Sequence, residues 1–393
     1  MLDLRRLRDQ IDRFESHEAE TRERRRRQQE RAQAVLSACA ERWKQVRAQV
    51  AEAEPRRLVA ALRESPNGVH EAPARPTPIT VVATDGSQIY PDRHVEPLFF
   101  LLNVSQVAFQ YGTQEAPVLD AVPRLHFEED LSEHVDEVLR SMTTELVSAL
   151  RDEMELELLL ETARSAAVPG RPLLALADGT LIRWMIRGMN NEAAEDALIA
   201  RYTDYLQEFR AQELPLASYV SMPATTEVVN LLRFVVGDLE GADAVLDDVS
   251  GEEPSLEGLL DRHVFDTLLA PRQRSATFGA TSHIQADYPP GSEICYFYLR
   301  VPSTSSQDEI GRVEVPRWVA DVPAVLDRIH ATILHECEKG DGYPLVLSEA
   351  HEQAVIRAPE RESFFRLMER RLRRAGLSPT NSRKRHSKQR PRV

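Results

Sequence analysis

Two short apolar runs, each followed by aspartate, glycine and a hydroxyl residue, constrain the fold of this chain more than any other feature. Residues 79–87 read ITVVATDGS, and residues 171–180 read RPLLALADGT. Apolar runs of this length that end in turn residues are typical of buried strands. Strand and helix patterns alternate around them, so we predict an α/β fold with a mixed sheet flanked by helices. Such folds place functional groups at strand ends, where Asp85 and Asp178 lie.

The first 65 residues are polar almost throughout and predict one or two long helices. A narrow apolar stripe at helical spacing runs along the first of them, formed by Leu4, Leu7, Ile11 and Phe14. Such a stripe suits a coiled coil or a helical hairpin that serves as a dimer or partner arm. A solvated, charged helix is the simpler interpretation, above all for the basic run RERRRR over residues 22–27.

A proline-rich linker separates this arm from the rest of the chain, because prolines at this density stop helices. They are Pro66, Pro73, Pro76 and Pro78. We therefore predict a helical arm with its linker over residues 1–75, a main domain over 76–380 and a basic tail over 381–393. In the main domain we expect a strand over 97–110, a long helix over 130–166 and paired strands over 292–301 and 310–319.

Composition excludes several classes of protein. The chain of 393 residues carries a net charge of −14, which is unusual for a nucleic-acid binder, but positive charge is concentrated in residues 22–27 and in the tail. Its three cysteines are far apart, which argues against structural zinc and disulfides and fits a cytoplasmic location. No apolar run is long enough to span a membrane. Motifs for ATP hydrolysis, dinucleotide binding, zinc proteases and serine hydrolases are missing.

The two Asp-Gly motifs are the first candidates for chemistry. Carboxylates placed directly after buried strands are partly desolvated, and two of them brought together repel each other unless a cation compensates. Hard oxygen ligands in an open cluster suit Mg²⁺ or Mn²⁺ and, in pairs, phosphodiester cleavage. The alternative is ordinary turn chemistry, in which Asp accepts backbone hydrogen bonds and Gly supplies a positive φ. Either motif alone favours the turn, and the repetition makes the two interpretations about equally strong.

A third carboxylate is expected from the helix over residues 130–166. Its apolar side chains cover most of the circumference, and Glu157 and Glu161 fall in the remaining gap, where they are solvated. Glu155 falls inside the apolar arc, where an unpaired carboxylate is unfavourable. We therefore predict Glu155 as the ligand, with Glu157 and Glu161 as the alternatives.

A histidine near the C-terminus is a further candidate. Residues 344–347 are apolar and strand-like, and they lead into Glu349, Ala350 and His351. A histidine at such a strand–helix junction can bind a metal or transfer a proton. An isolated histidine at the start of a helix is more often satisfied by a backbone carbonyl.

Together these segments resemble the NurA family of DNA repair nucleases, in order, from about residue 81 to the end of the chain. The matching segments are TDGSQIYPDRH, LLALADGTLI, YVSMPATTEVVNLLR, RSATFGATS, EICYFYLRV, EIGRVEVPRWVA and GYPLVLSEAHEQAV, with the basic tail. The resemblance implies an RNase H-like (Piwi-like) core, a homodimer, Mn²⁺-dependent nuclease activity on DNA and a hexameric HerA-type ATPase partner. It also carries the metal ligands over to Asp85, a helix glutamate and Asp178, and the C-terminal pair over to Tyr343 and His351.

We expect this chain to be a metal-dependent deoxyribonuclease that processes DNA ends in double-strand break repair. Asp85, Glu155, Asp178 and His351 are expected to hold one or two Mn²⁺ or Mg²⁺ ions, and Tyr343 to orient the substrate or a ligand. Arg274, Arg312 and Arg317 are expected either to line the DNA path or to form surface ion pairs. Two alternatives are an adaptor of the ATPase with a degenerate site and a phosphoesterase of small nucleotides.

Overall fold

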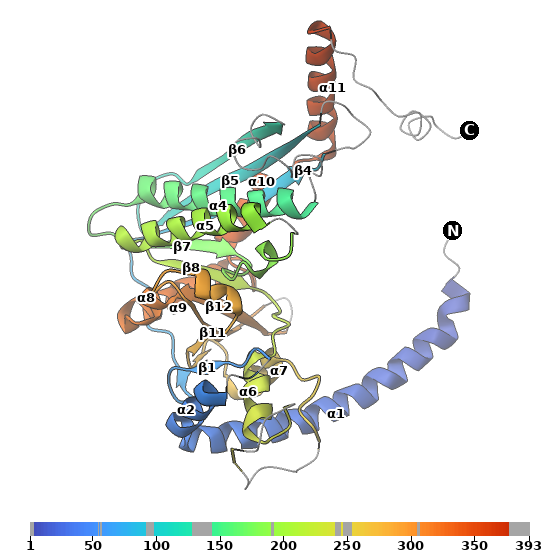
Figure 1. Cartoon of the computed structure of the whole chain (residues 1–393), viewed down its shortest axis with the longest axis vertical. Coiled ribbons are helices and arrows are strands. Elements are labelled where there is room, and N and C mark those ends of the chain that lie inside the picture. Colours follow the sequence, from blue (N-terminus) through green and yellow to red (C-terminus); the bar gives the residue numbers. More distant parts are fainter. Residues whose placement is uncertain are drawn as a thin grey trace. The chain divides into compact units, whose positions relative to one another are not determined.

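The computed structural model describes residues 4–53, 55, 57–91, 98–127, 144–189, 192–239, 245–246, 254–304 and 307–376 (Figure 1). The chain divides into two compact units, each assembled from segments that are distant in sequence. Unit 1 consists of Met1–Ala74, Tyr219–Gln285 and Glu293–Gly342; unit 2 consists of Arg75–Ser218, Ala286–Ser292 and Tyr343–Val393. Residues 76–380, predicted as one domain, thus contribute to both units, and the predicted tail lies outside the described residues.

Unit 2 is built on a mixed sheet. Its strands are β3 (Ile79–Thr84), β4 (Gly86–Ile89), β5 (Phe99–Tyr111), β6 (Val118–Phe127), β7 (Leu173–Asp178) and the first part of β8 (Leu216–Val220). Strand β5 pairs antiparallel with β3, β4 and β6, whereas β3 pairs parallel with β7, which neighbours β8. Every residue of β3 is buried, which is why its sequence is a continuous apolar run rather than an alternating one.

Helices cover both faces of this sheet (Figure 1). They are α4 (Thr144–Ala166) and α5 (Glu192–Ala211), which pack against each other, and α10 (Leu345–Ala354). Helix α11 (Ala358–Arg374) has no buried residue and projects beyond the sheet (Figure 1). Alternate residues of β5 separate the two faces: Leu102 packs with Leu158 of α4, while the Nδ2 of Asn103 donates to the carbonyl of Ala354 at 2.8 Å, at the end of α10. The predicted mixed α/β sheet flanked by helices is confirmed, and its RNase H-like character stays a prediction. The predicted start of α4, over residues 130–143, lies outside the described residues.

Unit 1 combines helices with antiparallel strands. Its helices are α1 (Arg8–Glu41), α2 (Trp43–Ala53), α6 (Glu227–Val235), α7 (Asp261–Leu268), α8 (Arg317–Ala320) and α9 (Pro323–Lys339). Its strands are β1 (Ala61–Leu62), β2 (Val69–His70), β9 (Arg274–Ser275), β10 (Phe278–Gly279), β11 (Ile294–Val301) and β12 (Glu309–Pro316). Strands β11 and β12 form an antiparallel pair, as predicted. One hydrophobic core joins the C-terminal half of α1 to α6, α7 and β11.

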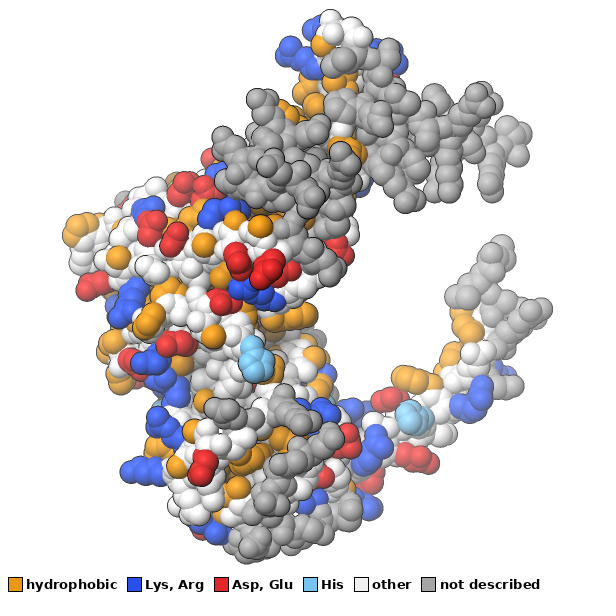
Figure 2. All heavy atoms as spheres, viewed as in Figure 1, with side chains coloured by type: hydrophobic (Ala, Val, Ile, Leu, Met, Phe, Trp, Pro, Cys, Tyr) orange, Lys and Arg blue, Asp and Glu red, His pale blue; other side chains and the backbone are white. Residues whose placement is uncertain are grey.

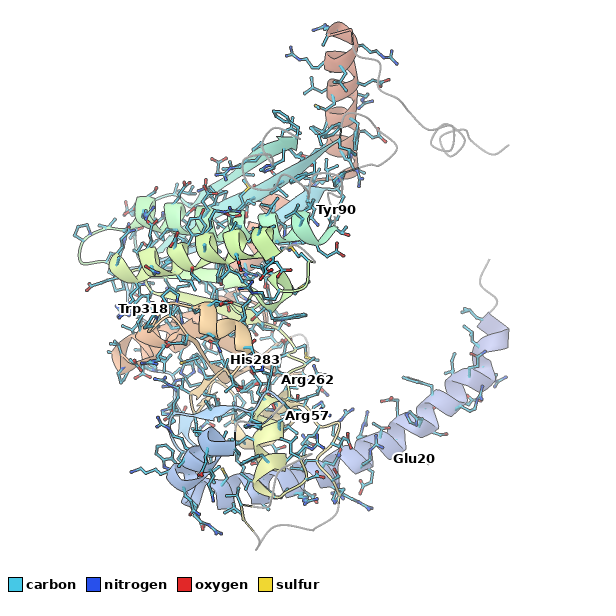
Figure 3. The ribbon with its side chains drawn as sticks, in the orientation of Figure 1. Glu20, Arg57, Tyr90, Arg262, His283 and Trp318 are labelled. Carbon is cyan, nitrogen blue, oxygen red and sulfur yellow. The ribbon has the colours of Figure 1, made fainter. Side chains whose placement is uncertain are left out.

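The N-terminal arm is helical, and its first turns are exposed. The predicted apolar stripe lies at the surface, with Leu4, Ile11 and Phe14 all more than half exposed. Figure 2 shows hydrophobic, basic and acidic side chains side by side on the visible face of α1, and the exposed Glu20 is labelled on this helix in Figure 3. The coiled coil stays a prediction. None of the helices in the described part of the chain is long and apolar enough to cross a membrane.

Two of the three arginines considered for a DNA path are buried in unit 1, so that alternative is wrong for them. Arg312 is 2% exposed and is held by the carboxylates of Glu227 and Glu314. Arg274 is also buried and forms an ion pair with Asp327. A buried guanidinium needs such partners to offset its lost hydration, and it is not available to a phosphate. Arg317 is half exposed and forms an ion pair with Glu293, as the second interpretation, a surface ion pair, predicted.

Candidate active site

Asp85 lies at a break between two strands that form one line. Strands β3 and β4 pair with the same strand β5 in one continuous register, with Ala83 opposite Val107 and Gly86 opposite Val104. At the break, the amide of Asp85 donates to the Oγ of Ser105 at 3.1 Å instead of to a backbone carbonyl. The prediction of a strand followed by a turn is therefore wrong for this motif. The chain continues as a strand, and the carboxylate of Asp85 is held within the sheet.

Gly86 is needed here for close packing rather than for a turn. A Cβ at this position would clash with the Oε1 of Glu155 and lie 2.7 Å from the Cγ of Arg151. No positive φ is recorded for Gly86, whereas Gly179 in the second motif has φ +74° and open space where a Cβ would lie. The two Asp-Gly motifs therefore use glycine for different reasons, and only the second is a turn.

Asp178 ends β7 beside Asp85. Strands β3 and β7 are parallel neighbours, with Thr84 opposite Ala177, so the next residue on each strand is an aspartate. Neighbouring strands lie about 4.8 Å apart, which brings the two carboxylates to the same edge of the sheet. The hydroxyl of Tyr343 donates to the Oδ1 of Asp178 at 2.8 Å. Tyr343 and Asp178, both predicted as site residues, are thus in direct contact.

The helix α4 brings Glu155 against the same break. The Oγ1 of Thr84 donates to the backbone carbonyl of Glu155 at 2.9 Å, which fixes this turn of the helix beside Asp85. The Glu155 side chain is only 16% exposed. Of the two alternatives, Glu157 is bound to Arg124 on β6 and Glu161 is exposed. The structure thus places Glu155, rather than either alternative, beside Asp85.

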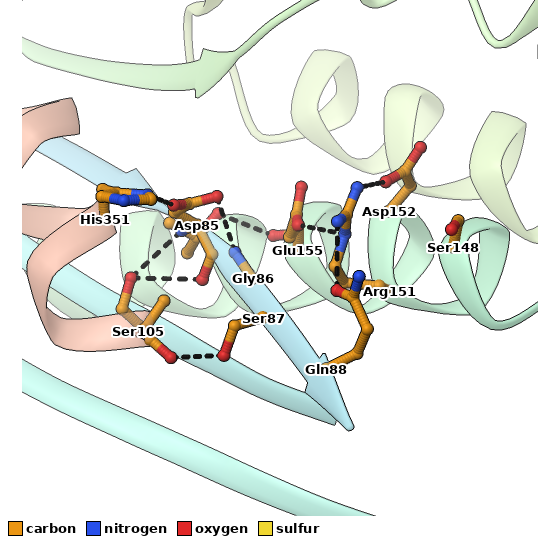
Figure 4. Close-up of polar contacts among 12 residues, drawn as sticks. Asp85, Gly86, Ser87, Gln88, Ser105, Ser148, Arg151, Asp152, Glu155 and His351 are labelled. Carbon is orange, nitrogen blue, oxygen red and sulfur yellow. Dashed lines mark hydrogen bonds and ion pairs between the residues drawn. The ribbon is translucent and has the colours of Figure 1, made fainter. Parts of the chain in front are cut away.

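His351 reaches Asp85 from α10. Its Nδ1 lies 2.8 Å from the Oδ2 of Asp85 (Figure 4). Residues 345–347, expected to be a strand, are the first turn of this helix, so that expectation is wrong. Pro344, which cannot donate to a sheet, precedes the helix. The helix end is anchored at the carbonyl of Ala354, which accepts from the Oγ of Ser87 at 2.5 Å.

Three charged residues that the sequence analysis missed complete the cluster. Arg151 lies one turn before Glu155, with 3.1 Å between its Nε and the Oε1 of Glu155, and also binds Asp152 (Figure 4). The other oxygen of Asp152 is 3.2 Å from Arg183, in the loop after Asp178. The i, i+4 spacing of Arg151 and Glu155 is a sequence signal that could have indicated the pair. Nothing in the sequence indicates the contact with Arg183.

Charge in this cluster changes the protonation of two carboxyl groups. Burial, followed by repulsion from Asp152, raises the pKa of Glu155 to about 8, and Asp85 adds to the rise. Burial also raises the pKa of Asp178, with a further contribution from Asp85, while the hydrogen bond from Tyr343 opposes the rise. Asp85 thus interacts electrostatically with both of the other predicted ligands. Such perturbed carboxyl groups are typical of functional sites.

The donor set suits a divalent cation, although the donors do not converge on one point. Among the described residues, no three acidic, histidine or cysteine side chains are arranged to hold a metal ion as they stand. Each predicted ligand has a protein partner instead: His351 for Asp85, Tyr343 for Asp178 and Arg151 for Glu155. With Asp152, four carboxylates face two guanidinium groups, which leaves an excess of negative charge. Hard oxygen donors with such an excess match Mg²⁺ or Mn²⁺ in chemistry.

Comparison with known proteins identifies the family. Residues 79–356, which is more than half of the chain, match the family model of the NurA domain. The chain belongs to the NurA family. This match begins at β3 and ends just after α10, so it includes every residue of the cluster described above.

Two nucleases are among the solved structures that the chain matches. The NurA nuclease from Sulfolobus solfataricus is 16% identical, with a TM-score of 0.48 over 78% of this chain and 88% of that chain. LC9-RNase H1, a type 1 RNase H with the type 2 active-site motif, is 15% identical, with a TM-score of 0.22 over 50% of this chain and 88% of that one. No curated protein matches the sequence.

Proposed function

We propose that this member of the NurA family is a nuclease that cleaves DNA phosphodiesters with the help of a divalent cation. The proposal rests on the position of three carboxyl groups at one edge of the sheet. Asp85 and Asp178 follow two neighbouring strands, and Glu155 lies on the helix packed against them. Membership of the NurA family supports a nuclease role for this cluster. The HerA-type ATPase, the homodimer and the role in break repair stay predictions that rest on the family resemblance.

The protein side chains have separate tasks in this proposal. Asp85, Glu155, Asp178 and His351 would hold Mn²⁺ or Mg²⁺, which supplies an activated water and stabilises charge on the phosphodiester oxygens. Tyr343 keeps Asp178 oriented through its hydroxyl. His351, two-thirds exposed, also holds Asp85 in place through its Nδ1.

A substrate with accessible bases fits the surface next to the cluster. The 3₁₀ turn η3 (Trp184–Ile186) follows Arg183 and packs on α4 and α5. Trp184 is 61% exposed, although the residues before it are anchored: the amide of Arg183 donates to the hydroxyl of Tyr288 at 3.0 Å. An exposed tryptophan on an anchored turn is a stacking platform for an unpaired base. Trp184 therefore supports single-stranded DNA or a frayed end as the substrate.

Cleavage of end-labelled linear DNA by the purified chain in Mn²⁺, Mg²⁺ or EDTA tests the proposal. Asp85→Asn and Asp178→Asn should each lose cleavage at least 100-fold, since each removes a charge from the cluster. Glu157→Gln is the matched control, because Glu157 lies on the same helix as Glu155 but binds Arg124. Cleavage that persists in EDTA, or in both aspartate variants, would refute the assignment.

A further inference from the structure

Arg151 is the one cation in contact with a predicted metal ligand in the described part of the site. Its guanidinium reaches three partners: the Oε1 of Gln88 at 3.1 Å, the Oδ1 of Asp152 at 2.8 Å and the Oε1 of Glu155 at 3.1 Å (Figure 4). Because α4 is packed on β4, these contacts join the helix to the strand that follows Asp85. Arg151 therefore lies beside the place where a divalent cation would bind.

The three contacts of Arg151 are not equivalent. The terminal nitrogens make hydrogen bonds to Gln88 and Asp152, but the buried Nε makes no hydrogen bond with satisfactory geometry among the described residues. Its contact with Glu155 is thus an ion pair without a well-aligned hydrogen bond. Glu155 can leave this pair while Arg151 keeps its other two partners.

Those other partners are themselves held in place. Gln88 donates from its Nε2 to the hydroxyl of Tyr90 at 2.9 Å, and Tyr90, labelled at the end of β4 in Figure 3, lies 3.2 Å from the Oγ of Ser148 on α4. Asp152 is bound on its second oxygen by Arg183. The guanidinium of Arg151 is therefore fixed by a network that does not include Asp85, Asp178 or His351.

We propose that Arg151 is a built-in counter-ion that occupies Glu155 when no divalent cation is bound and must release it for the cation to bind. A nearly buried glutamate next to Asp85 and Asp152 is costly to ionise without a positive partner, and Arg151 supplies that partner in the metal-free protein whenever Glu155 is ionised. The same contact competes with metal binding, because Glu155 must leave Arg151 before it can bind the cation. The free energy of breaking the contact therefore weakens the affinity for the metal. The inference rests on the proposed function, since it concerns the ligands of that cation.

The counter-ion role and an orienting role for Arg151 predict opposite changes in metal affinity when this residue is replaced. Removing a residue that orients Glu155 toward the metal would weaken metal binding, whereas removing a competing counter-ion strengthens it. We expect Arg151→Gln to bind Mn²⁺ about tenfold more tightly than the unaltered protein, as followed by electron paramagnetic resonance of free Mn²⁺. Arg151→Lys, which keeps the charge but cannot reach all three partners, should tighten binding less.

Thermal unfolding in EDTA provides a readout that does not involve metal. Arg151→Gln should melt several degrees lower than the unaltered protein, because Glu155 is left without its partner, and adding Glu155→Gln should restore part of the loss. The control is Arg124→Gln. It breaks the ion pair between Arg124 on β6 and Glu157, which lies on the same helix as Glu155 but is not part of the cluster around Asp85. That variant should leave Mn²⁺ affinity unchanged.

The outcomes separate this inference from the proposed function. Tighter Mn²⁺ binding by Arg151→Gln, with unchanged binding by Arg124→Gln, supports the counter-ion role. Equal or weaker binding by Arg151→Gln overturns the role while leaving the metal site in place. If Arg151→Gln does not fold in EDTA, Arg151→Lys decides by the same criterion. An unaltered protein that binds no Mn²⁺ overturns the proposed function, and the counter-ion role with it.

Discussion

Replacing the glycine of each Asp-Gly motif by alanine separates packing at the site from backbone strain. In Gly86→Ala, the new methyl group would clash with the Oε1 of Glu155 and lie 2.7 Å from the Cγ and 3.0 Å from the Cδ of Arg151. Ordinary contacts of this kind are about 3.5–4.0 Å, so these side chains must move by roughly 1 Å. Because side chains rather than backbone are in the way, we expect a loss of about 1 kcal/mol, at the low end for overpacking.

The functional cost of the same substitution should be much larger. The atoms that must move belong to a proposed metal ligand and to its counter-ion, and a displacement of about 1 Å at a catalytic group costs roughly 100-fold in rate. In Gly179→Ala the methyl group meets no atom within 4 Å, and the cost is the strain of φ +74° in a residue with a side chain. That strain is about 1–2 kcal/mol. The two variants should thus be similar in stability but differ in activity.

Urea unfolding at pH 7 and cleavage of end-labelled DNA at saturating Mn²⁺ measure the two effects side by side. We expect Gly86→Ala to lose about 100-fold in cleavage rate and Gly179→Ala to stay within about tenfold of the unaltered protein. If Gly86→Ala cleaves DNA normally, Glu155 does not lie against Gly86 in the working enzyme. If the two variants lose activity in proportion to their loss of stability, the argument that the methyl group at position 86 displaces Glu155 and Arg151 is refuted.

Three further predictions concern single groups. In EDTA, the free energy of unfolding should fall as the pH rises from about 5 to 8. The pKa of Glu155 is raised from 4.5 to about 8 in the folded protein, so in this range the folded state keeps a proton that the unfolded chain has lost. The fall is at most about 1.4 kcal/mol per pKa unit, and a urea series on Glu155→Gln should show a shallower slope. Tyr343→Phe removes the hydrogen bond that lowers the pKa of Asp178, so the acid limb of the pH–rate profile should move to higher pH; an unmoved limb contradicts this role. Trp184→Ala should weaken binding of single-stranded DNA by about 1–3 kcal/mol in a fluorescence titration, with little effect on blunt duplex DNA.

The longer buried strands could be predicted from local patterns, whereas β4 and β6 were not predicted. Strands β3 and β7 are buried on both faces and therefore appear as uninterrupted apolar runs, and the pair β11 and β12 was predicted from two strand-like segments close together. The stretch at residues 344–347 was misassigned because a short apolar run has no clear period, and the helix after Pro344 is set by packing on the sheet. Helix α5 was not anticipated in the sequence analysis.

The partners of each charged group could not be predicted. Helical phase placed Glu155 in the apolar arc of its helix, and this separated it from Glu157. The same phase says nothing about Arg183, which reaches Asp152 from another segment. Nothing in the sequence distinguishes Arg312 from a surface arginine available to DNA, and only the fold shows it buried between two carboxylates. Charge in a sequence does not reveal burial.

The sequence by itself determined the buried strands β3 and β7 and the positions of Asp85 and Asp178 near their ends, because these depend on hydrophobic periodicity and on neighbours along the chain. Tertiary structure alone decided that His351 contacts Asp85 across 266 positions and that Tyr343 contacts Asp178 across 165. It also decided that Gly86 makes room for Glu155 instead of forming a turn. These contacts depend on how α4 and α10 pack on the sheet, and packing between distant segments leaves no period in the sequence to detect.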